Sequence, residues 1–286
     1  MSSGYVPEAD QVIQAECLEV LPGMADGCIR LIYIDPPFNS GKRQSRRSLQ
    51  TVADEEGGDR NGFGGRRYRS RVLGELSYDD SHSDYLGFLE PRLCEARRLL
   101  DEQGTLYVHL DYREAHYVKL LLDEVFGREC FLNEIVWAYD FGGRSKRRWP
   151  AKHDTILVYV KDPARYYFDS AEVDREPYMA PGLVGPEKAA RGKLPTDVWW
   201  HTIVPTNSSE KTGYPTQKPE GVLRRIVAAS SAPGDRCLDF FAGSGTLGSV
   251  ARELGRSFVL IDSNPEAIEV IERRLGVRRT SPPAAG

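Results

Sequence analysis

The chain has 286 residues, of which 40% are hydrophobic and 28% are charged, and its formal net charge is −4. This length can bury a full core without metals or disulfides, and no apolar run approaches the roughly 20 residues of a membrane helix. The five cysteines are scattered without a Cys-x-x-Cys pair, and His82, His109 and His116 show no ligand spacing, so we expect no disulfide framework and no metal site. The first residues, MSSGYVPEAD, show no signal peptide, which predicts a cytoplasmic protein without a membrane partner.

Short β-rich runs alternate with amphipathic segments along most of the sequence. The predicted strands lie at about 31–34, 105–110, 133–140, 153–161, 236–240 and 257–261. The predicted helices lie at 84–100, 113–126, 218–232 and 246–254, with a last helix from Pro265 that Asn264 caps. Repeated strand and helix units with buried strands indicate a parallel or mixed sheet covered on both faces. We therefore expect one doubly wound α/β domain over residues 1–286.

Three segments depart from this alternation. Residues 41–78 are rich in Gly, Arg and Ser with little periodicity, which predicts a long, mobile, basic loop. Residues 162–213 carry prolines among short polar runs, which predicts an irregular insertion. The run GGRSKRRWPAKH is basic without an acid, and a charge run of this kind is usually a solvated loop. Its candidate binding residues are Arg144, Lys146, Arg147 and Arg148.

A glycine-rich turn follows the strand at 236–240 and leads into the next helix. Glycines let the backbone approach a ligand closely, and the helix N-terminus offers unpaired N–H groups. The turn lacks the spacing of a dinucleotide site and of a P-loop, whereas Asp262 ends the next strand, where an acid can bond both hydroxyls of a ribose. These features indicate a site for an adenosine without phosphates. The turn residues assigned to it are Asp239, Phe241, Gly243, Ser244, Gly245 and Thr246.

The second motif, Asp35-Pro36-Pro37-Phe38, lies at the end of the predicted strand at 31–34. Two prolines fix the backbone and remove its donors, so their carbonyls can face outward as acceptors. The carboxylate of Asp35 adds an acceptor, and Phe38 adds a stacking face. This combination suits a flat aromatic amine. Alone the tetrapeptide would be read as a turn, but together with an adenosine site it is far more specific.

The two motifs together resemble those of the amino-methyltransferases, which move a methyl group from S-adenosylmethionine to an exocyclic nitrogen of a DNA base. Asp35 to Phe38 match the catalytic motif of that family, and Phe241 to Gly245 match its Phe-x-Gly-x-Gly cofactor motif. The catalytic motif comes first, as in the beta class, and residues 84–139 are similar to the modification subunits of type III restriction systems. The resemblance implies a Rossmann-like methyltransferase sheet, permuted so that the catalytic half precedes the cofactor-binding half.

The resemblance also implies S-adenosylmethionine as the cofactor and adds three residues to its site. Glu16 lies in ECLEVL, which resembles the usual opening segment of the class, although Asp is the commoner residue there. Gln217 and Lys218 lie in GYPTQKP, which resembles a further cofactor segment. Phe38 replaces the commoner Tyr of the catalytic motif.

The chemistry of the acceptor indicates how such a site works. The lone pair of an exocyclic amine is delocalised into its ring, and hydrogen bonds to the Asp35 carboxylate and the Pro36 carbonyl would localise it for direct attack on the methyl group. The base must leave the duplex, so we expect base flipping, with Phe38 stacking on the base. We then expect double-stranded DNA as the partner, with the two basic segments in contact with its phosphates. Residues 162–213 are expected to form the target-recognition region. A homodimer and a companion restriction endonuclease are further expected partners.

Adenine N6 is the expected target, because the cytosine-N4 members of the family more often carry Ser in place of Asp35. Cytosine-N4 methylation is the nearest alternative. A related motif serves glutamine methylation of proteins, but Asp35 and the basic segments argue against it. An inactive methyltransferase fold that only binds nucleic acid is the alternative from another class, and the two intact motifs argue against it.

Overall fold

The computed structural model describes residues 4–38, 44–53, 60–61, 67–78 and 84–281, and only the backbone within 44–78. Eight strands form one sheet in the order β1-β11-β10-β2-β6-β8-β7-β9. The first five in this order are parallel, whereas β8 is antiparallel to both neighbours and β7 pairs parallel with β9. The strands are β1 (Gln11–Gln14), β2 (Ile29–Ile34), β6 (Leu100–Leu110), β7 (Phe131–Ala138), β8 (His153–Val160), β9 (Val198–Trp200), β10 (Arg236–Asp239) and β11 (Ser257–Asp262).

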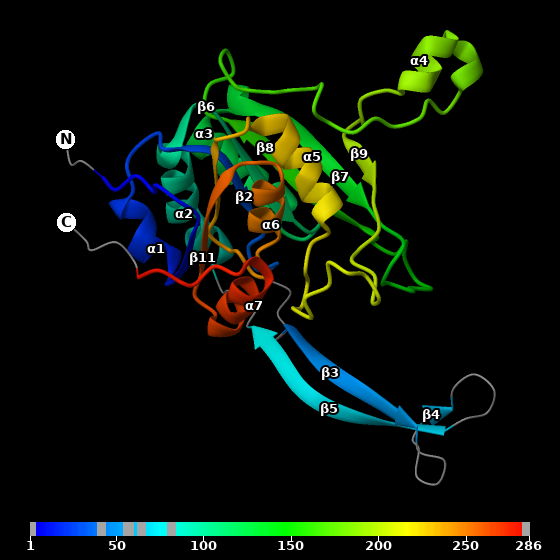
Figure 1. The fold of residues 1–286 in the computed structure, drawn as a ribbon. Coiled ribbons are helices and arrows are strands. Elements are labelled where there is room, and N and C mark those ends of the chain that lie inside the picture. The colour runs from blue at the N-terminus through cyan, green and yellow to red at the C-terminus, as the bar shows by residue number, and fades with distance from the viewer. Residues whose placement is uncertain (1–3, 39–43, 54–59, 62–66, 79–83, 282–286) are drawn as a thin grey trace.

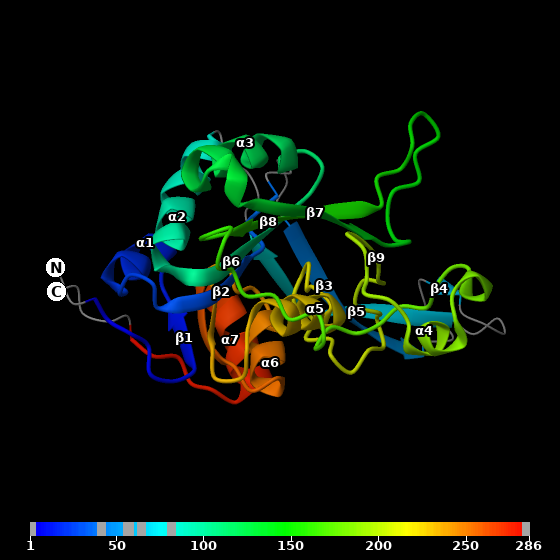
Figure 2. The ribbon, with the colours of Figure 1, turned by 90° about the horizontal axis from the view of Figure 1, so that it is seen from above.

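Helices cover both faces of this sheet. Figure 2 shows α1, α2 and α3 on one side and α5, α6 and α7 on the other. Successive residues of β2 enter opposite cores, Ile32 the first and Leu31 and Tyr33 the second, as expected of a strand buried on both faces. No described helix is both long and apolar enough to span a membrane. The helices are α1 (Cys17–Val20), α2 (Tyr85–Leu99), α3 (Ala115–Phe126), α4 (Pro186–Arg191), α5 (Glu220–Ser230), α6 (Thr246–Glu253) and α7 (Pro265–Leu275).

The sheet has a switch point between β2 and β10. The two strands are parallel neighbours, with Leu31 opposite Cys237 and Ile32 opposite Leu238. The chain leaves β10 into α6 on one face, whereas α2, which follows β2 in the main body, covers the other face. The loops at the carboxyl ends of the two strands therefore diverge and open a crevice, which is where ligands bind in such sheets. Asp35 follows β2 and Asp239 ends β10, so segments 200 residues apart in sequence meet there.

Most predicted elements are present, with ends displaced by a few residues. Asn264 caps α7 as predicted, because its side chain accepts a hydrogen bond from Glu266 N at 2.9 Å. The sequence analysis missed β1 and α1. Four residues each are too short for a periodic signal, and β1 lies at the edge of the sheet, where its neighbours are β11 and, by one bridge, Thr280.

The prediction for residues 41–78 was wrong in part, because the segment is not an irregular loop. β3 (Gln44–Ala53) and β5 (Arg67–Tyr78) form a long antiparallel ribbon, and β4 (Arg60–Asn61) adds a short third strand. The ribbon extends away from the main body (Figure 1). Strand pairing satisfies the backbone whatever the side chains are, so a composition rich in Gly, Arg and Ser concealed it. The mobility of the segment stays a prediction, and residues 41–43, 54–59 and 62–66 lie outside the described residues.

The prediction for residues 162–213 needs a smaller correction. Most of the segment is irregular, but it contains a 3-10 turn (Pro181–Leu183), α4 and β9. β9 joins the main sheet by pairing with the end of β7, with Trp199 opposite Trp137. Three residues between prolines and polar runs are too few to be recognised as a strand from sequence. The segment therefore extends the sheet at its far edge, and its role in target recognition stays a prediction.

Candidate active site

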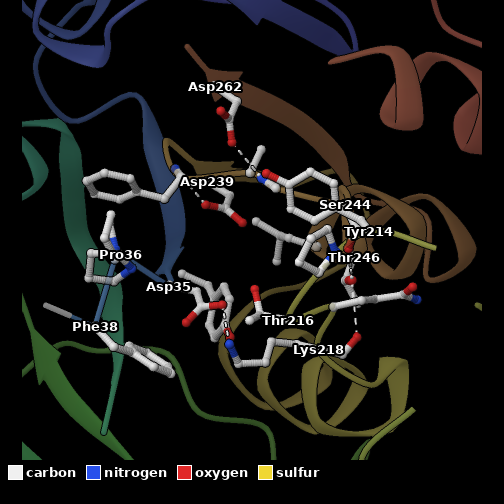
Figure 3. A pocket seen from close by; sticks show the side chains of 18 residues that line it. Asp35, Pro36, Phe38, Tyr214, Thr216, Lys218, Asp239, Ser244, Thr246 and Asp262 are labelled. Carbon is white, nitrogen blue, oxygen red and sulfur yellow. Dashed lines mark hydrogen bonds and ion pairs between the residues drawn. The ribbon is translucent and has the colours of Figure 1, made fainter. Parts of the chain in front are cut away.

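A cavity lies in the crevice at the switch point, and we call it the first cavity. Figure 3 shows Asp239 and Asp262 at one end of it and Phe38, Asp35 and Lys218 at the other. It is lined by Tyr33, Asp35, Pro36, Pro37, Phe38, Tyr214, Pro215, Thr216, Gln217, Lys218, Asp239, Phe241, Ala242, Gly243, Ser244, Thr246, Leu247 and Asp262. The structure thus brings both sequence motifs to one cavity, together with the segment that contains Gln217 and Lys218.

The glycine turn after β10 is held by Asp262. One carboxylate oxygen accepts a hydrogen bond from Gly243 N at 2.8 Å, and the other accepts one from Asn264 N at 2.9 Å. Gly243 and Gly245 adopt φ of +49° and +71°, a region that disfavours side chains. A Cβ on Gly245 would come within 2.9 Å of Ile271, so this glycine allows α6 to pack on α7 and does not line the cavity.

Three carboxylates and one ammonium group give the first cavity an acidic character. Asp239 is only 3% exposed, and burial raises its pKa well above the ordinary value. A hydrogen bond from Phe241 N and the charge of Lys218 oppose this shift, whereas the charges of Asp35 and Asp262 add to it. Burial likewise raises the pKa of Asp262. A cationic ligand would relieve this repulsion, so the cavity favours positive charge.

Asp35 and Lys218 form an ion pair at the other end of the cavity. Lys218 is only 8% exposed, and its ammonium group also lies 4.8 Å from the centre of the Phe38 ring. Lys218 binds Oδ2 of Asp35, while Oδ1 is buried and has no hydrogen-bond partner among the described residues. A buried carboxylate oxygen without a donor is costly in a folded protein. The structure therefore presents an acceptor that a ligand amine can satisfy.

A buried network beneath the catalytic motif was missed from the sequence. Tyr33 Oη lies 2.8 Å from Nδ1 of His109, and Nε2 of His109 lies 3.1 Å from Oδ2 of Asp154. Tyr139 donates a hydrogen bond to the other oxygen of Asp154 at 2.9 Å. Burial would raise the pKa of Asp154, but the contact with His109, the charge of Lys218 and the hydrogen bond from Tyr139 together lower it. The network ties β2, two residues before Asp35, to β6, β8 and the end of β7.

Glu16 does not line the first cavity. Its side chain caps α1 by accepting a hydrogen bond from Leu18 N at 2.7 Å, and it pairs with Arg92 at 2.5 Å. Burial would raise its pKa, but these contacts together lower it. An acid before a short helix is a common cap, which is the signal that the sequence analysis did not weigh. Its role toward a cofactor stays a prediction.

A second cavity of about 780 Å³ adjoins the first and shares Phe38, Thr216, Gln217 and Lys218 with it. Thr216 has a φ of +55°, which is strained for a β-branched residue and places the strain at the junction of the two cavities. The other lining residues are Asp111, Tyr112, Arg113, Trp137, Tyr139, Asp140, Phe141, Ala151, His153, Asp154, Thr202, Ile203, Val204, Pro205, Thr206 and Lys211. Arg144, Lys146, Arg147 and Arg148 lie outside both cavities, on the exposed loop between β7 and β8.

Comparisons with known proteins agree with this geometry. A family model described as DNA methylase matches residues 29–273. "DNA adenine methyltransferase YhdJ" of Escherichia coli (strain K12) is 32% identical over 278 residues, which cover 94% of this chain and 84% of that protein. "Type II methyltransferase M.HpaI" of Haemophilus parainfluenzae is 30% identical over 267 residues, which cover 93% and 74%.

Solved structures share the fold at lower identity. The M1.HpyAVI complex with SAM has a TM-score of 0.59 and 19% identity, covering 93% of this chain and 99% of that one. The cytosine-N4-specific PvuII DNA methyltransferase has a TM-score of 0.64 and 16% identity, covering 95% and 88%. These likenesses confirm the predicted Rossmann-like methyltransferase fold. With the family match over most of the chain, they lead to one identification: the chain belongs to the N6/N4 family of S-adenosylmethionine-dependent DNA amino-methyltransferases.

Proposed function

We propose that the protein methylates adenine at N6 within a specific sequence of double-stranded DNA, after the target base has left the helix. The observation that carries the proposal is the buried Oδ1 of Asp35, which has no hydrogen-bond partner among the described residues and lies in the same cavity as Phe38. A carboxylate at this position favours adenine by the pattern of the family, and the relative from E. coli is named for adenine. A companion endonuclease, a homodimer and a cytoplasmic location stay predictions.

The residues of the first cavity fit the cofactor. S-adenosylmethionine supplies, when bound, a positively charged sulfonium that carries the reactive methyl group. Three carboxylates and one ammonium group line the cavity, and a cationic ligand would offset the repulsion among the carboxylates that adds to the raised pKa of Asp239. Asp262 and the glycine turn would hold the adenosine part, and Asp262 would keep its bond to Gly243 N while accepting from a ribose hydroxyl, since each carboxylate oxygen has two acceptor sites.

Asp35 is the group that would act on the target amine. Its Oδ1 would accept a hydrogen bond from one N–H of the amine, and the Pro36 carbonyl would accept one from the other, which localises the nitrogen lone pair. Lys218 holds Oδ2 and so fixes the direction in which Oδ1 points. Phe38 lines both cavities and would stack on the base, with about 1–3 kcal/mol from such a contact. Lys218 is thus a positioning residue for Asp35 as well as a lining residue of the cofactor cavity.

The second cavity would receive the extruded base. Its aromatic walls include Trp137 and Tyr139, which offer flat surfaces next to Phe38. The basic loop between β7 and β8 begins at the rim of this cavity, where Phe141 is one of the lining residues. Exposed cations at such a rim are well placed for phosphates on either side of the target base.

The affinity for S-adenosylmethionine is expected to rise with pH. In the free protein Asp239 has a raised pKa, and a bound cation would favour its ionised form. Binding below that pKa must then release protons, and the affinity levels off once Asp239 is already ionised. Calorimetry in buffers of different ionisation enthalpy would measure the protons released. The Asp239→Asn variant should lose most of the pH dependence, and S-adenosylhomocysteine, which lacks the sulfonium charge, should show less of it. An identical profile for variant and wild type would assign the titration to another group.

Mapping the methylated base tests the proposed target. The protein would be expressed in cells without DNA methylation, and their DNA examined by single-molecule sequencing and by mass spectrometry of nucleosides. We expect N6-methyladenine at one recurring sequence, and none with Asp35→Ala. N4-methylcytosine instead would keep the enzyme class but overturn the adenine assignment, whereas no modified base would favour an inactive DNA-binding fold.

A further inference from the structure

The loop between β7 and β8 is held by contacts at its base, and its outer part is exposed. We call residues 139–152 the β7–β8 loop. At the base, Tyr139 N donates a hydrogen bond to Lys152 O at 3.0 Å, and Lys152 forms an ion pair with Asp140. Every residue from 141 to 150 is exposed, and the loop extends away from the sheet (Figure 2). Its outer part is organised locally, because Ser145 Oγ accepts hydrogen bonds from Arg147 N and Arg148 N.

A tryptophan lies in this exposed part. The Trp149 side chain is 95% exposed, and among the described residues it makes no hydrogen bond and no aromatic contact. A large planar side chain in water is unfavourable unless it has a partner surface. Its neighbours restrict the chemistry of that partner. Four of the five cations of the loop form no ion pair with any described residue, namely Arg144, Lys146, Arg147 and Arg148, whereas the fifth, Lys152, is the one paired with Asp140.

The loop also lies beside the second cavity, which would receive the target base. Residues at both of its ends line the second cavity, Tyr139 and Phe141 on one side and Ala151 on the other. Phe38, which would stack on the extruded base, lines the same cavity. When a base leaves the duplex, the bases above and below it lose a stacking partner, and an inserted flat side chain can replace it. Trp149 has the shape for that gap, and the adjacent cations match the phosphates around it.

We propose that Trp149 inserts into the DNA base stack at the position that the target base vacates, and so stabilises the extruded state. This inference rests on the proposed function, because it needs a base-flipping reaction. It is independent of whether the target is adenine or cytosine. Insertion acts on the equilibrium between stacked and extruded base, whereas the neighbouring cations act on affinity for DNA of any sequence. The two contributions can therefore be separated by experiment.

The test uses the full-length protein with Trp149→Ala and a duplex carrying 2-aminopurine at the target position. The fluorescence of 2-aminopurine rises when it leaves the stack. We expect the equilibrium constant for extrusion to fall about 5- to 150-fold, which is the loss of one stacking contact, while the dissociation constant for DNA without the target sequence, where no base is extruded, changes little. Trp149→Phe should restore most of the extrusion. The matched control is Tyr117→Ala, because Tyr117 is also exposed, at 60%, and lies on α3, outside both the loop and the predicted target-recognition region.

Methyl transfer supplies a second readout. On a fully paired duplex Trp149→Ala should transfer the methyl group more slowly in a single turnover. On a duplex with a mispaired target the loss should largely disappear, because that base is extruded without help. The proposal would be overturned if Trp149→Ala extruded the target base as well as the wild type does. Weaker DNA binding with unchanged extrusion would also overturn it, because Trp149 would then be an ordinary DNA contact. Neither result would bear on the methylated product, so failure of the proposed function remains distinguishable.

Discussion

Replacing Asp35 by alanine is expected to slow methyl transfer at least about 100-fold, which is the usual effect of removing a positioned polar catalytic group. The acceptor for the target amine, Oδ1 of Asp35, is lost, whereas Asp262 and the glycine turn remain to hold the cofactor. The measurement is single-turnover methylation of a duplex that contains the mapped site. Asp35→Asn should lose less activity, because its amide oxygen can still accept one hydrogen bond.

Because Asp35 is ion-paired with Lys218, the Asp35→Ala variant should also lose stability. Lys218 is nearly buried, so Asp35→Ala leaves an ammonium group without its carboxylate, and losing one partner of a buried pair costs about 3–5 kcal/mol of unfolding free energy. The double variant Asp35→Ala with Lys218→Met removes the stranded charge. It should regain stability in urea unfolding without regaining activity. Transfer within about tenfold of wild type in the double variant would reject the catalytic role of Asp35.

The sequence was sufficient to predict the two motifs and the edge of the sheet on which they lie. Asp35 and Asp239 each stand at the carboxyl end of a buried strand, and parallel strands place such ends at one edge. That the strands are direct neighbours could not be read from composition or periodicity, since strand order depends on how the helices cross over the sheet. The resemblance to a permuted methyltransferase provided that step.

Contacts between segments that are distant along the chain could not be predicted from the sequence. The pairing of Lys218 with Asp35 joins residues 183 apart, and the sequence analysis placed Lys218 only with the cofactor. The Tyr33, His109 and Asp154 network draws on three separate strands, and a lone histidine in an apolar strand carries no signal of its partners. For Glu16 the structure shows a local capping contact that the sequence analysis did not weigh, and its role toward a cofactor stays a prediction. Family patterns locate residues along the chain, whereas hydrogen bonds depend on the fold.

The four cations in the exposed part of the β7–β8 loop, residues 141–150, are expected to dominate affinity for DNA. The protein has a net charge of −4, so attraction to phosphates must come from local clusters. Neutralising Arg144, Lys146, Arg147 and Arg148 together should weaken binding to every DNA sequence. If each cation contacts one phosphate, the slope of log affinity against log salt should flatten by about 3.6, because each lost contact removes about 0.9. Fluorescence anisotropy at several salt concentrations measures both quantities.

A matched control tests whether the salt dependence comes from the loop cations or from exposed cations anywhere on the protein. Arg128, Arg273 and Arg278 are exposed cations elsewhere on the protein, and their neutralisation should change the salt slope far less per charge. The affinity for S-adenosylmethionine should be unchanged in the loop variant, since none of its four cations lines the first cavity. An unchanged salt slope would mean that the loop is a solvated surface. The phosphates would then have to contact another basic segment, for which residues 42–71, the other basic segment of the sequence, are the next candidate.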